Sequence, residues 1–153
     1  MRITKYRTEL DQDFHCVLVK EKSCNYYADQ LHTPDAIVNM LNDLFRLEYQ
    51  SEEFLYMVAF NKKMRPLGVF EVSHGTVDCS LCTPREIFIK AMLCGACSIV
   101  IAHNHPSMDT SPSGEDIDVY KRLKESGNII GIPLIDSLIV GKGFYSFHES
   151  WES

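Results

Sequence analysis

Hydrophobic residues recur with two different periods along the first half of the chain. Apolar positions three and four residues apart over 37–45 predict an amphipathic helix that begins at Thr33. Runs rich in β-branched and aromatic residues predict strands at 14–20, 54–60 and 67–72. The helix has an apolar stripe, so we expect it to pack on a sheet made by these strands.

The second half of the chain continues with a helix and a strand. Thr83 has the features of a helix N-cap, with Pro84 in the first turn and Glu86 completing a capping box, so the pattern predicts a helix over 83–93. The continuous apolar run 98–102 is typical of a strand that is buried on both faces.

A third helix is expected from about Ser113 or Gly114 to Ser126, with Gly127 as its C-cap. The remaining apolar runs predict strands at 129–140 and 144–147. Strands that alternate with helices predict an α/β or α+β fold, in which helices sandwich a mixed β-sheet. We expect a single domain that spans residues 1–153.

Composition and charge narrow the class of protein. The 153 residues suit one domain, and no run approaches the roughly 20 apolar residues of a membrane span. The segment 1–13 lacks the apolar part of a secretory signal, so we expect a cytoplasmic protein. The net charge of −6 disfavours nucleic acid as a partner, because nucleic-acid-binding proteins usually carry clustered Lys and Arg.

The six cysteines include two CxxC pairs, Cys79 with Cys82 and Cys94 with Cys97. Two such pairs can hold a structural zinc ion, but the predicted helix between them is about 15 Å long at roughly 1.5 Å per residue. Four sulfur atoms at that separation cannot share one ion. We therefore expect free, buried thiols.

The candidate chemistry begins directly after the buried strand, at His103-Asn104-His105-Pro106. Side chains two residues apart on extended backbone point the same way, so both imidazoles can face one metal ion. Pro106 favours extended backbone at His105 and keeps the two rings in line. The alternative is a pair of surface histidines at a strand end.

Asp116 follows His105 by eleven residues and falls in the first turn of the third predicted helix. Two imidazoles and one carboxylate leave a fourth zinc position open for water, as in catalytic zinc sites. Ser113 and Asp116 also fit a capping box, which alone would explain both residues. The two interpretations are compatible, because a capped first turn is a rigid place from which to present a ligand.

Glu71 is the candidate general base, on the same face of its predicted strand as Leu67 and Val69. A charge in a half-buried apolar strand is costly unless it is paired. We expect Glu71 to take a proton from water and pass it to a leaving amine, and Ser113 to donate to the oxyanion. A bound zinc ion would activate the water and polarise the carbonyl. The alternative is an edge-strand glutamate that points to solvent.

The order Glu71, His103-x-His105, seven residues, Ser113, two residues, Asp116 resembles the JAMM signature of the JAB/MPN metallopeptidases. Within that group the chain is most similar to bacterial RadC-like proteins over roughly 33–147, through segments 71–76, 84–86, 103–107, 111–117 and 138–141. The resemblance implies a sheet sandwiched by helices, with a zinc ion, an acid/base residue and oxyanion support. The implied residues are His103, His105 and Asp116 for zinc, Glu71 as the acid/base, and Ser113 for the oxyanion.

Two features depart from that family's pattern. Longer RadC-type proteins carry an N-terminal helix-hairpin-helix region, and we find none in this sequence, which removes the usual candidate for DNA contact. The loop after the histidines commonly reads Pro-Ser-Gly, whereas here Met108 follows Ser107. This change affects the shape of the loop and leaves every candidate ligand in place.

The sequence favours a zinc-dependent hydrolase that acts on a peptide or isopeptide bond of a peptide or protein substrate. A non-catalytic MPN-like scaffold is the second hypothesis, but such scaffolds typically lack the ligands that this chain keeps. A DNA-associated accessory protein is the third. An HNH nuclease is disfavoured, because the residues of that motif are spread over a ββα-metal unit and are not contiguous.

Overall fold

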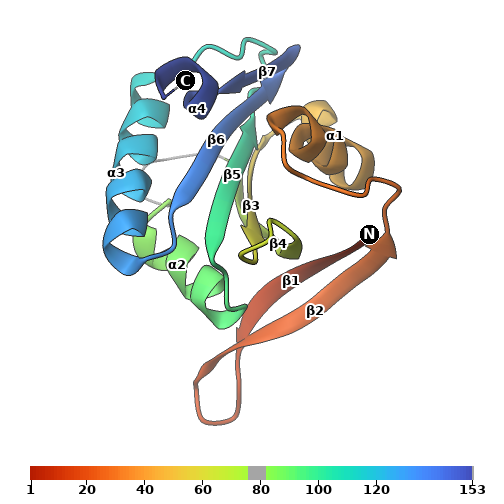
Figure 1. Cartoon of the computed structure of the whole chain (residues 1–153), viewed down its shortest axis with the longest axis vertical. Helices are drawn as coiled ribbons and strands as arrows, with labels where there is room; N and C mark the ends of the chain where they lie inside the picture. The colour runs from red at the N-terminus through yellow and green to blue at the C-terminus, as the bar shows by residue number, and fades with distance from the viewer. Residues whose placement is uncertain (76–81, 153) are drawn as a thin grey trace.

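A computed structural model describes residues 1–75 and 82–152 of the chain. Seven strands form one mixed sheet in the order β2-β1-β4-β3-β5-β6-β7 (Figure 1). This architecture confirms the predicted α/β class with a mixed sheet. The strands span Arg2–Leu10 (β1), Cys16–Asn25 (β2), Glu53–Phe60 (β3), Pro66–Gly75 (β4), Ser98–Asn104 (β5), Leu134–Gly141 (β6) and Gly143–Ser146 (β7).

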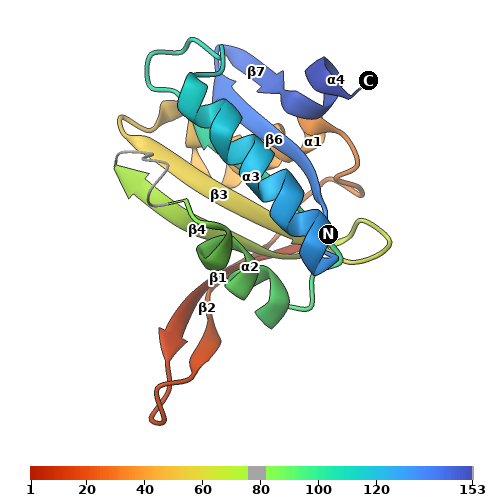
Figure 2. The same ribbon diagram turned by 90° about the vertical axis from the view of Figure 1, so that its left-hand side faces the viewer.

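Helices cover both faces of this sheet, with α1 on one face and α2 and α3 on the other (Figure 1, Figure 2). Side chains of β3 alternate between the two layers: Leu55 and Met57 join the core under α2 and α3, and Tyr56 and Val58 join the core under α1. In the described part of the chain the helices are α1 (Pro34–Phe45), the short 3₁₀ helix η1 (Leu47–Tyr49), α2 (Pro84–Leu93), α3 (Gly114–Ile130) and α4 (Phe147–Trp151).

The strand β5 lies at the centre of the molecule, and all of its residues are buried. β3 pairs with it antiparallel on one edge and β6 pairs with it parallel on the other. The connection from β5 to β6 runs through α3, as parallel neighbours require. The prediction of a strand buried on both faces at 98–102 is therefore confirmed.

A long antiparallel hairpin of β1 and β2 extends away from the rest of the molecule (Figure 2). It joins the sheet through two parallel residue pairs, Lys5 with Val69 and Tyr6 with Phe70. The hydrophobic pattern predicted a strand only at 14–20. It missed β1 because charged residues interrupt the apolar positions of that strand.

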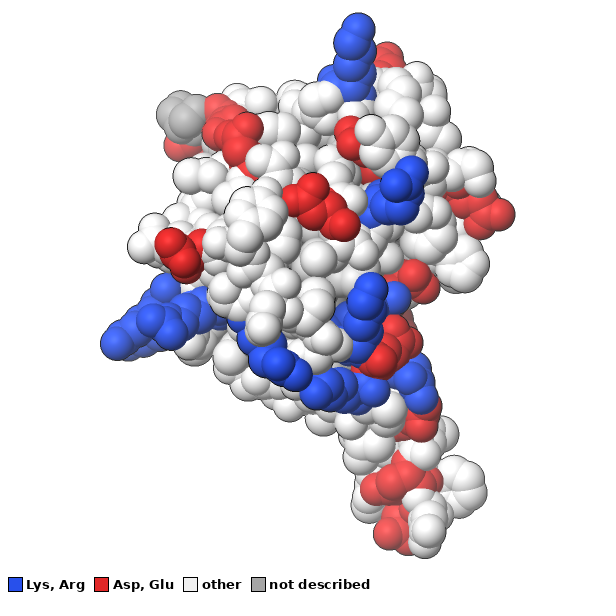
Figure 3. Space-filling view, turned by 90° about the vertical axis from the view of Figure 1, so that its right-hand side faces the viewer, with Lys and Arg blue, Asp and Glu red and all other residues white. Residues whose placement is uncertain are grey.

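The face shown in Figure 3 has its lysine and arginine side chains gathered near the base of this hairpin, with acidic side chains beside several of them. On the hairpin itself, Lys5 and Arg7 approach Glu21 at 3.2 and 3.9 Å. The positive charges of this ribbon are thus partly compensated within it. None of the helices in residues 1–75 and 82–152 combines the length and apolarity needed to cross a membrane.

The predicted helix starts at Thr33 and Thr83 are confirmed. The Thr33 hydroxyl accepts from the Ala36 N–H at 3.3 Å, and the Thr83 hydroxyl accepts from the Glu86 N–H at 3.4 Å. Each N-cap satisfies a backbone donor that the first turn of a helix leaves without an intrahelical partner.

The predicted end of the third helix is wrong. α3 continues past Gly127 to Ile130, so residues 129–130 are helical and β6 begins later, at Leu134. The C-cap is Gly131, whose φ of 86° lies in the left-handed region that glycine tolerates. The short helix α4, which follows β7, was not predicted.

The cysteine predictions are borne out in part. Cys82 is buried and Cys94 is half-buried, at opposite ends of α2, whereas Cys97 is exposed in the turn before β5. Burial was therefore the wrong expectation for Cys97, because this turn carries its side chain to the surface. Cys79 lies outside the described residues. Among the described residues no cysteine belongs to a cluster that could hold a metal ion.

Space explains the glycine at position 127, in the last turn of α3. A Cβ at this position would lie 2.6 Å from the Ile132 carbonyl oxygen, 3.2 Å from the Leu134 nitrogen and 3.3 Å from the Phe88 ring. The absence of a side chain lets α3 approach α2 and the start of β6 closely.

We predict that Gly127→Ala lowers the free energy of unfolding by about 1–2 kcal/mol, because overpacking outweighs the better helix propensity of alanine. Urea unfolding followed by circular dichroism measures this change. Gly114→Ala is the matched control, since nothing lies within 4 Å of its Cβ position. Equal stability of the Gly127 variant and the wild type would show that the close contact does not limit this site.

Candidate metal centre

His103 and His105 stand at the C-terminal end of the central strand. His103 pairs with Leu55 of β3 and is 4% exposed. The His105 N–H donates to the Val140 carbonyl of β6 at 2.8 Å, which continues the extended backbone beyond β5. The two Nε2 atoms are 3.1 Å apart. The prediction that both imidazoles face one point is confirmed.

Asp116 reaches the same point from the first turn of α3. Its Oδ1 lies 3.1 Å from His103 Nε2, and its Oδ2 lies 3.2 Å from His105 Nε2. Ser113 caps the helix: its hydroxyl accepts from the Asp116 N–H at 3.1 Å, and its own N–H donates to Asp116 Oδ2 at 2.8 Å. The capping box and the cluster with the histidines therefore both exist, as the sequence allowed.

The spacing of these three side chains fits a zinc ion. Their potential ligand atoms all lie within 4.8 Å of one another. Zinc bonds of about 2.0–2.2 Å in a tetrahedral arrangement separate neighbouring ligand atoms by roughly 3.3–3.6 Å, close to the distances between these atoms. One carboxylate and two imidazoles also match the donor types of zinc sites that keep an open position.

Hydrogen bonds prepare His105 for this role. Its Nδ1 lies 2.7 Å from the Asp109 carbonyl oxygen. A carbonyl oxygen only accepts, so Nδ1 donates this bond, and in the neutral ring Nε2 is the nitrogen left with a lone pair for a metal ion. Metal-binding histidines commonly have such a partner on the second ring nitrogen, which fixes the tautomer and the orientation of the ring.

The electrostatics of Asp116 also suit a ligand. Burial on its own would raise the pKa of this carboxyl group. The His103 imidazole and the N–H and O–H groups of Ser113 outweigh burial and hold the pKa of Asp116 well below its ordinary value. The carboxylate is therefore ionised at neutral pH.

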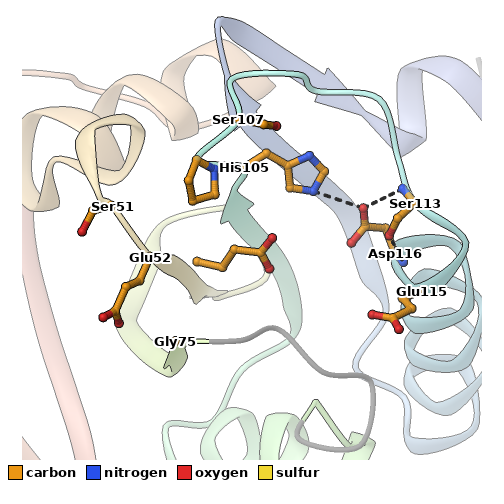
Figure 4. Close-up of a pocket in the computed structure, with 10 residues that line it drawn as sticks. Ser51, Glu52, Gly75, His105, Ser107, Ser113, Glu115 and Asp116 are labelled. Carbon is orange, nitrogen blue, oxygen red and sulfur yellow. Dashed lines mark hydrogen bonds and ion pairs between the residues drawn. The ribbon is translucent and has the colours of Figure 1, made fainter.

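The cluster opens into a cleft of about 560 Å³. Figure 4 shows His105 directed toward Asp116, with Ser113 beside it at the start of α3 and Ser51 and Glu52 on the other side of the cleft. The residues that line the cleft are Ser51, Glu52, Glu53, Gly75, His105, Pro106, Ser107, Ser113, Glu115 and Asp116. A substrate in this cleft would meet the cluster at one wall.

Glu71, the predicted general base, does not lie with the cluster. It pairs in register with Tyr56, whose side chain belongs to the core under α1, so Glu71 faces the opposite side of the sheet from His103. Its carboxylate is 3.7 Å from the Lys5 amino group and 3.7 Å from His74 Nδ1. The structure thus brings together four of the five predicted site residues and leaves out Glu71.

Glu53 is the carboxylate that the sequence analysis missed. It starts β3, lines the cleft, and lies two residues before Leu55 on the same face of the strand. Leu55 is the direct partner of His103, so Glu53 is on the same side of the sheet as His103. The sequence did contain a signal for Glu53, because this residue stands two positions before Leu55, an inward-facing position of a predicted strand.

Comparison with known proteins identifies the family of this chain. The family model described as RadC-like JAB domain matches residues 31–152. A UPF0758 protein of Alkaliphilus oremlandii is 40% identical over 112 residues, which cover 73% of this chain and 47% of the relative. A UPF0758 protein of Alkaliphilus metalliredigens is 36% identical over 126 residues, covering 82% of this chain and 53% of the relative.

The chain thus spans about half the length of these curated relatives. The match to the family model nevertheless includes both histidines, Ser113, Asp116 and Glu53, and it covers most of the chain. The chain belongs to the family of RadC-like JAB domains.

Proposed function

We propose that this protein is a zinc-dependent hydrolase of the metallopeptidase type, which cleaves a peptide or isopeptide bond. The observation that carries the proposal is the convergence of His103, His105 and Asp116 at the wall of a cleft, with ligand atoms 3.1–3.2 Å apart. A closed structural zinc site would need a fourth protein ligand. The open side of this cluster faces the cleft instead.

His103, His105 and Asp116 would hold the ion, which supplies Lewis-acid activation of water and of a carbonyl group when bound. Glu53 is our candidate for the general base, in place of Glu71. It is half-buried, it lines the cleft, and it projects from the same face of the sheet as His103. A carboxylate there can take a proton from water and deliver it to the leaving amine.

Ser113 is proposed to stabilise negative charge on the substrate oxygen. The capping bond uses the hydroxyl oxygen of Ser113 as an acceptor. The hydroxyl proton, which stabilises the Asp116 carboxylate in the free protein, would turn to donate to an oxyanion in the cleft that this residue lines. One such donor typically contributes about 3–4 kcal/mol to catalysis.

We predict that protein purified without a metal-binding tag contains near-stoichiometric zinc, and that His103→Ala and Asp116→Ala lose it. Removal of a residue that only hydrogen-bonds to a metal ligand weakens metal binding by about 10–100-fold. Loss of a direct ligand should weaken zinc binding by more than this. Mass spectrometry of the metal content measures this. His148→Ala is the matched control, because its imidazole is half exposed and lies outside the cluster. A wild-type protein that stays free of zinc after zinc is added would overturn the proposal.

We predict that Glu53→Gln lowers kcat by about 10²–10⁴-fold, the usual contribution of a general base, while Glu71→Gln keeps activity close to wild type. The assay is cleavage of a panel of peptides and lysine-linked isopeptides, with loss of activity in a chelator and recovery with zinc. Both variants should retain zinc and the wild-type circular dichroism spectrum. The opposite ranking of the two variants would return the base role to Glu71.

A further inference from the structure

Asn104 occupies the position between the two histidines, and its side chain takes part in none of the contacts of the metal cluster described above. It is 1% exposed. Its Oδ1 accepts from the Phe54 N–H at 2.7 Å. Its Nδ2 donates to the Glu52 carbonyl at 2.9 Å and to the Gln50 carbonyl at 3.3 Å. One buried side chain thus binds the backbone at three points about fifty residues earlier in the sequence.

Two of these three contacts are to the peptide groups on either side of Glu53. The Glu52 carbonyl belongs to the peptide before its Cα, and the Phe54 N–H belongs to the peptide after it. Holding both groups restricts the φ and ψ angles of Glu53 and so fixes the direction of its Cα–Cβ bond. Asn104 therefore acts on the orientation of Glu53 without touching its carboxylate.

The backbone ladder between β3 and β5 does not provide this restraint. Its registered pairs run from Phe60 with Ser98 to Leu55 with His103 and stop there. The start of β3 is held on one edge by the pairing of Glu53 with Gly75 in β4. On the β5 edge, the Asn104 side chain replaces the next backbone pair.

An amide side chain is well suited to this position. It offers one acceptor and two donors in a plane, and all three are used here. Aspartate would lack the donors to the two carbonyl groups, and an apolar residue would leave three buried backbone groups without this partner. Side chains alternate along the strand, so His103 lies on one face of the sheet and Asn104 on the other. Neighbouring residues can therefore contact the metal cluster and the segment around Glu53 independently.

We propose that Asn104 is a positioning residue that couples the metal-binding end of β5 to the segment that carries the general base Glu53. The inference rests on the proposed function, because it takes Glu53 to be the base. A displacement of about 1 Å at a catalytic group can cost about 100-fold in rate, so a clamp on the backbone of Glu53 has functional weight.

The test uses the full chain loaded with Co²⁺, whose visible absorption band reports on the surroundings of the ion. Wild type, Asn104→Ala, Asn104→Asp and Glu53→Gln are compared, with hydrogen exchange of the segment 50–56 as a second readout. Asn42→Ala is the matched control, because Asn42 accepts from the Glu48 N–H at 3.0 Å, a bond between side chain and backbone outside the site.

We expect Asn104→Ala to bind one equivalent of Co²⁺ and to shift the absorption band toward that of Glu53→Gln. The segment 50–56 should exchange at least about tenfold faster, because its anchoring hydrogen bonds are lost. Asn104→Asp keeps the size and the acceptor for the Phe54 N–H but replaces both donors with an oxygen that the two carbonyl groups repel, so it should change the band and the exchange in the same direction. It also serves as the readout if the alanine variant does not fold. Asn42→Ala should keep the wild-type band.

Three outcomes would overturn the inference, and they separate it from the proposed function. If Glu53→Gln shifts the band and both Asn104 variants keep the wild-type band, Asn104 has only a structural role and the hydrolase proposal stands. If Glu53→Gln leaves the band unchanged, Glu53 is not beside the ion and the base assignment fails with the inference. If the wild type binds no Co²⁺, the metal site itself is wrong.

Discussion

The pairing of β5 with β3 and β6 is the constraint on which the candidate site depends. The strand is buried on both faces and hydrogen-bonded on both edges, so its end cannot shift without breaking the centre of the sheet. His103 is the last residue of β5 that pairs with β3, and His105 is held by a bond to β6. The two imidazoles thus project from the end of a strand that is fixed on both faces and both edges, as a preorganised site requires.

The third side chain comes from an element whose position has a separate cause. Asp116 is set by the capping box with Ser113 at the start of α3, and α3 is drawn against the sheet by its own buried face and by the close contact at Gly127. The capping box therefore decides at which residue the helix begins, and packing decides where that residue lies in the molecule. The place of the Asp116 carboxylate beside the histidines therefore depends on both the capping box and the packing of α3.

Much of this could be predicted from the sequence, because the signals were local. The caps at Thr33, Thr83 and Ser113 and the apolar run of β5 each identify an element on their own. Local signals could not decide whether Glu71 or Glu53 is the candidate general base. The register between β3 and β4 shifts at this point: Leu55 pairs with Ser73, but the next residue, Tyr56, pairs with Glu71, so one residue of β4 has no partner in β3. Ser73 and Glu71 therefore face opposite sides of the sheet, although they are two positions apart in the sequence. Alternation along one strand cannot show such a shift, nor which face of the sheet carries His103.

The loop after the histidines shows how an unusual residue is accommodated next to the site. Met108 has a φ of 69°, in the left-handed region that favours glycine, which accounts for glycine being common there in similar proteins. Its carbonyl accepts from the Lys142 N–H at 3.1 Å and lies 2.7 Å from the place where Gly141 would carry a Cβ. The turn between β6 and β7 thus holds the loop close, one residue before the Asp109 carbonyl that fixes the tautomer of His105. The contacts that hold Met108 in this strained conformation also keep the Asp109 carbonyl beside His105, and a glycine at 141 leaves room for them.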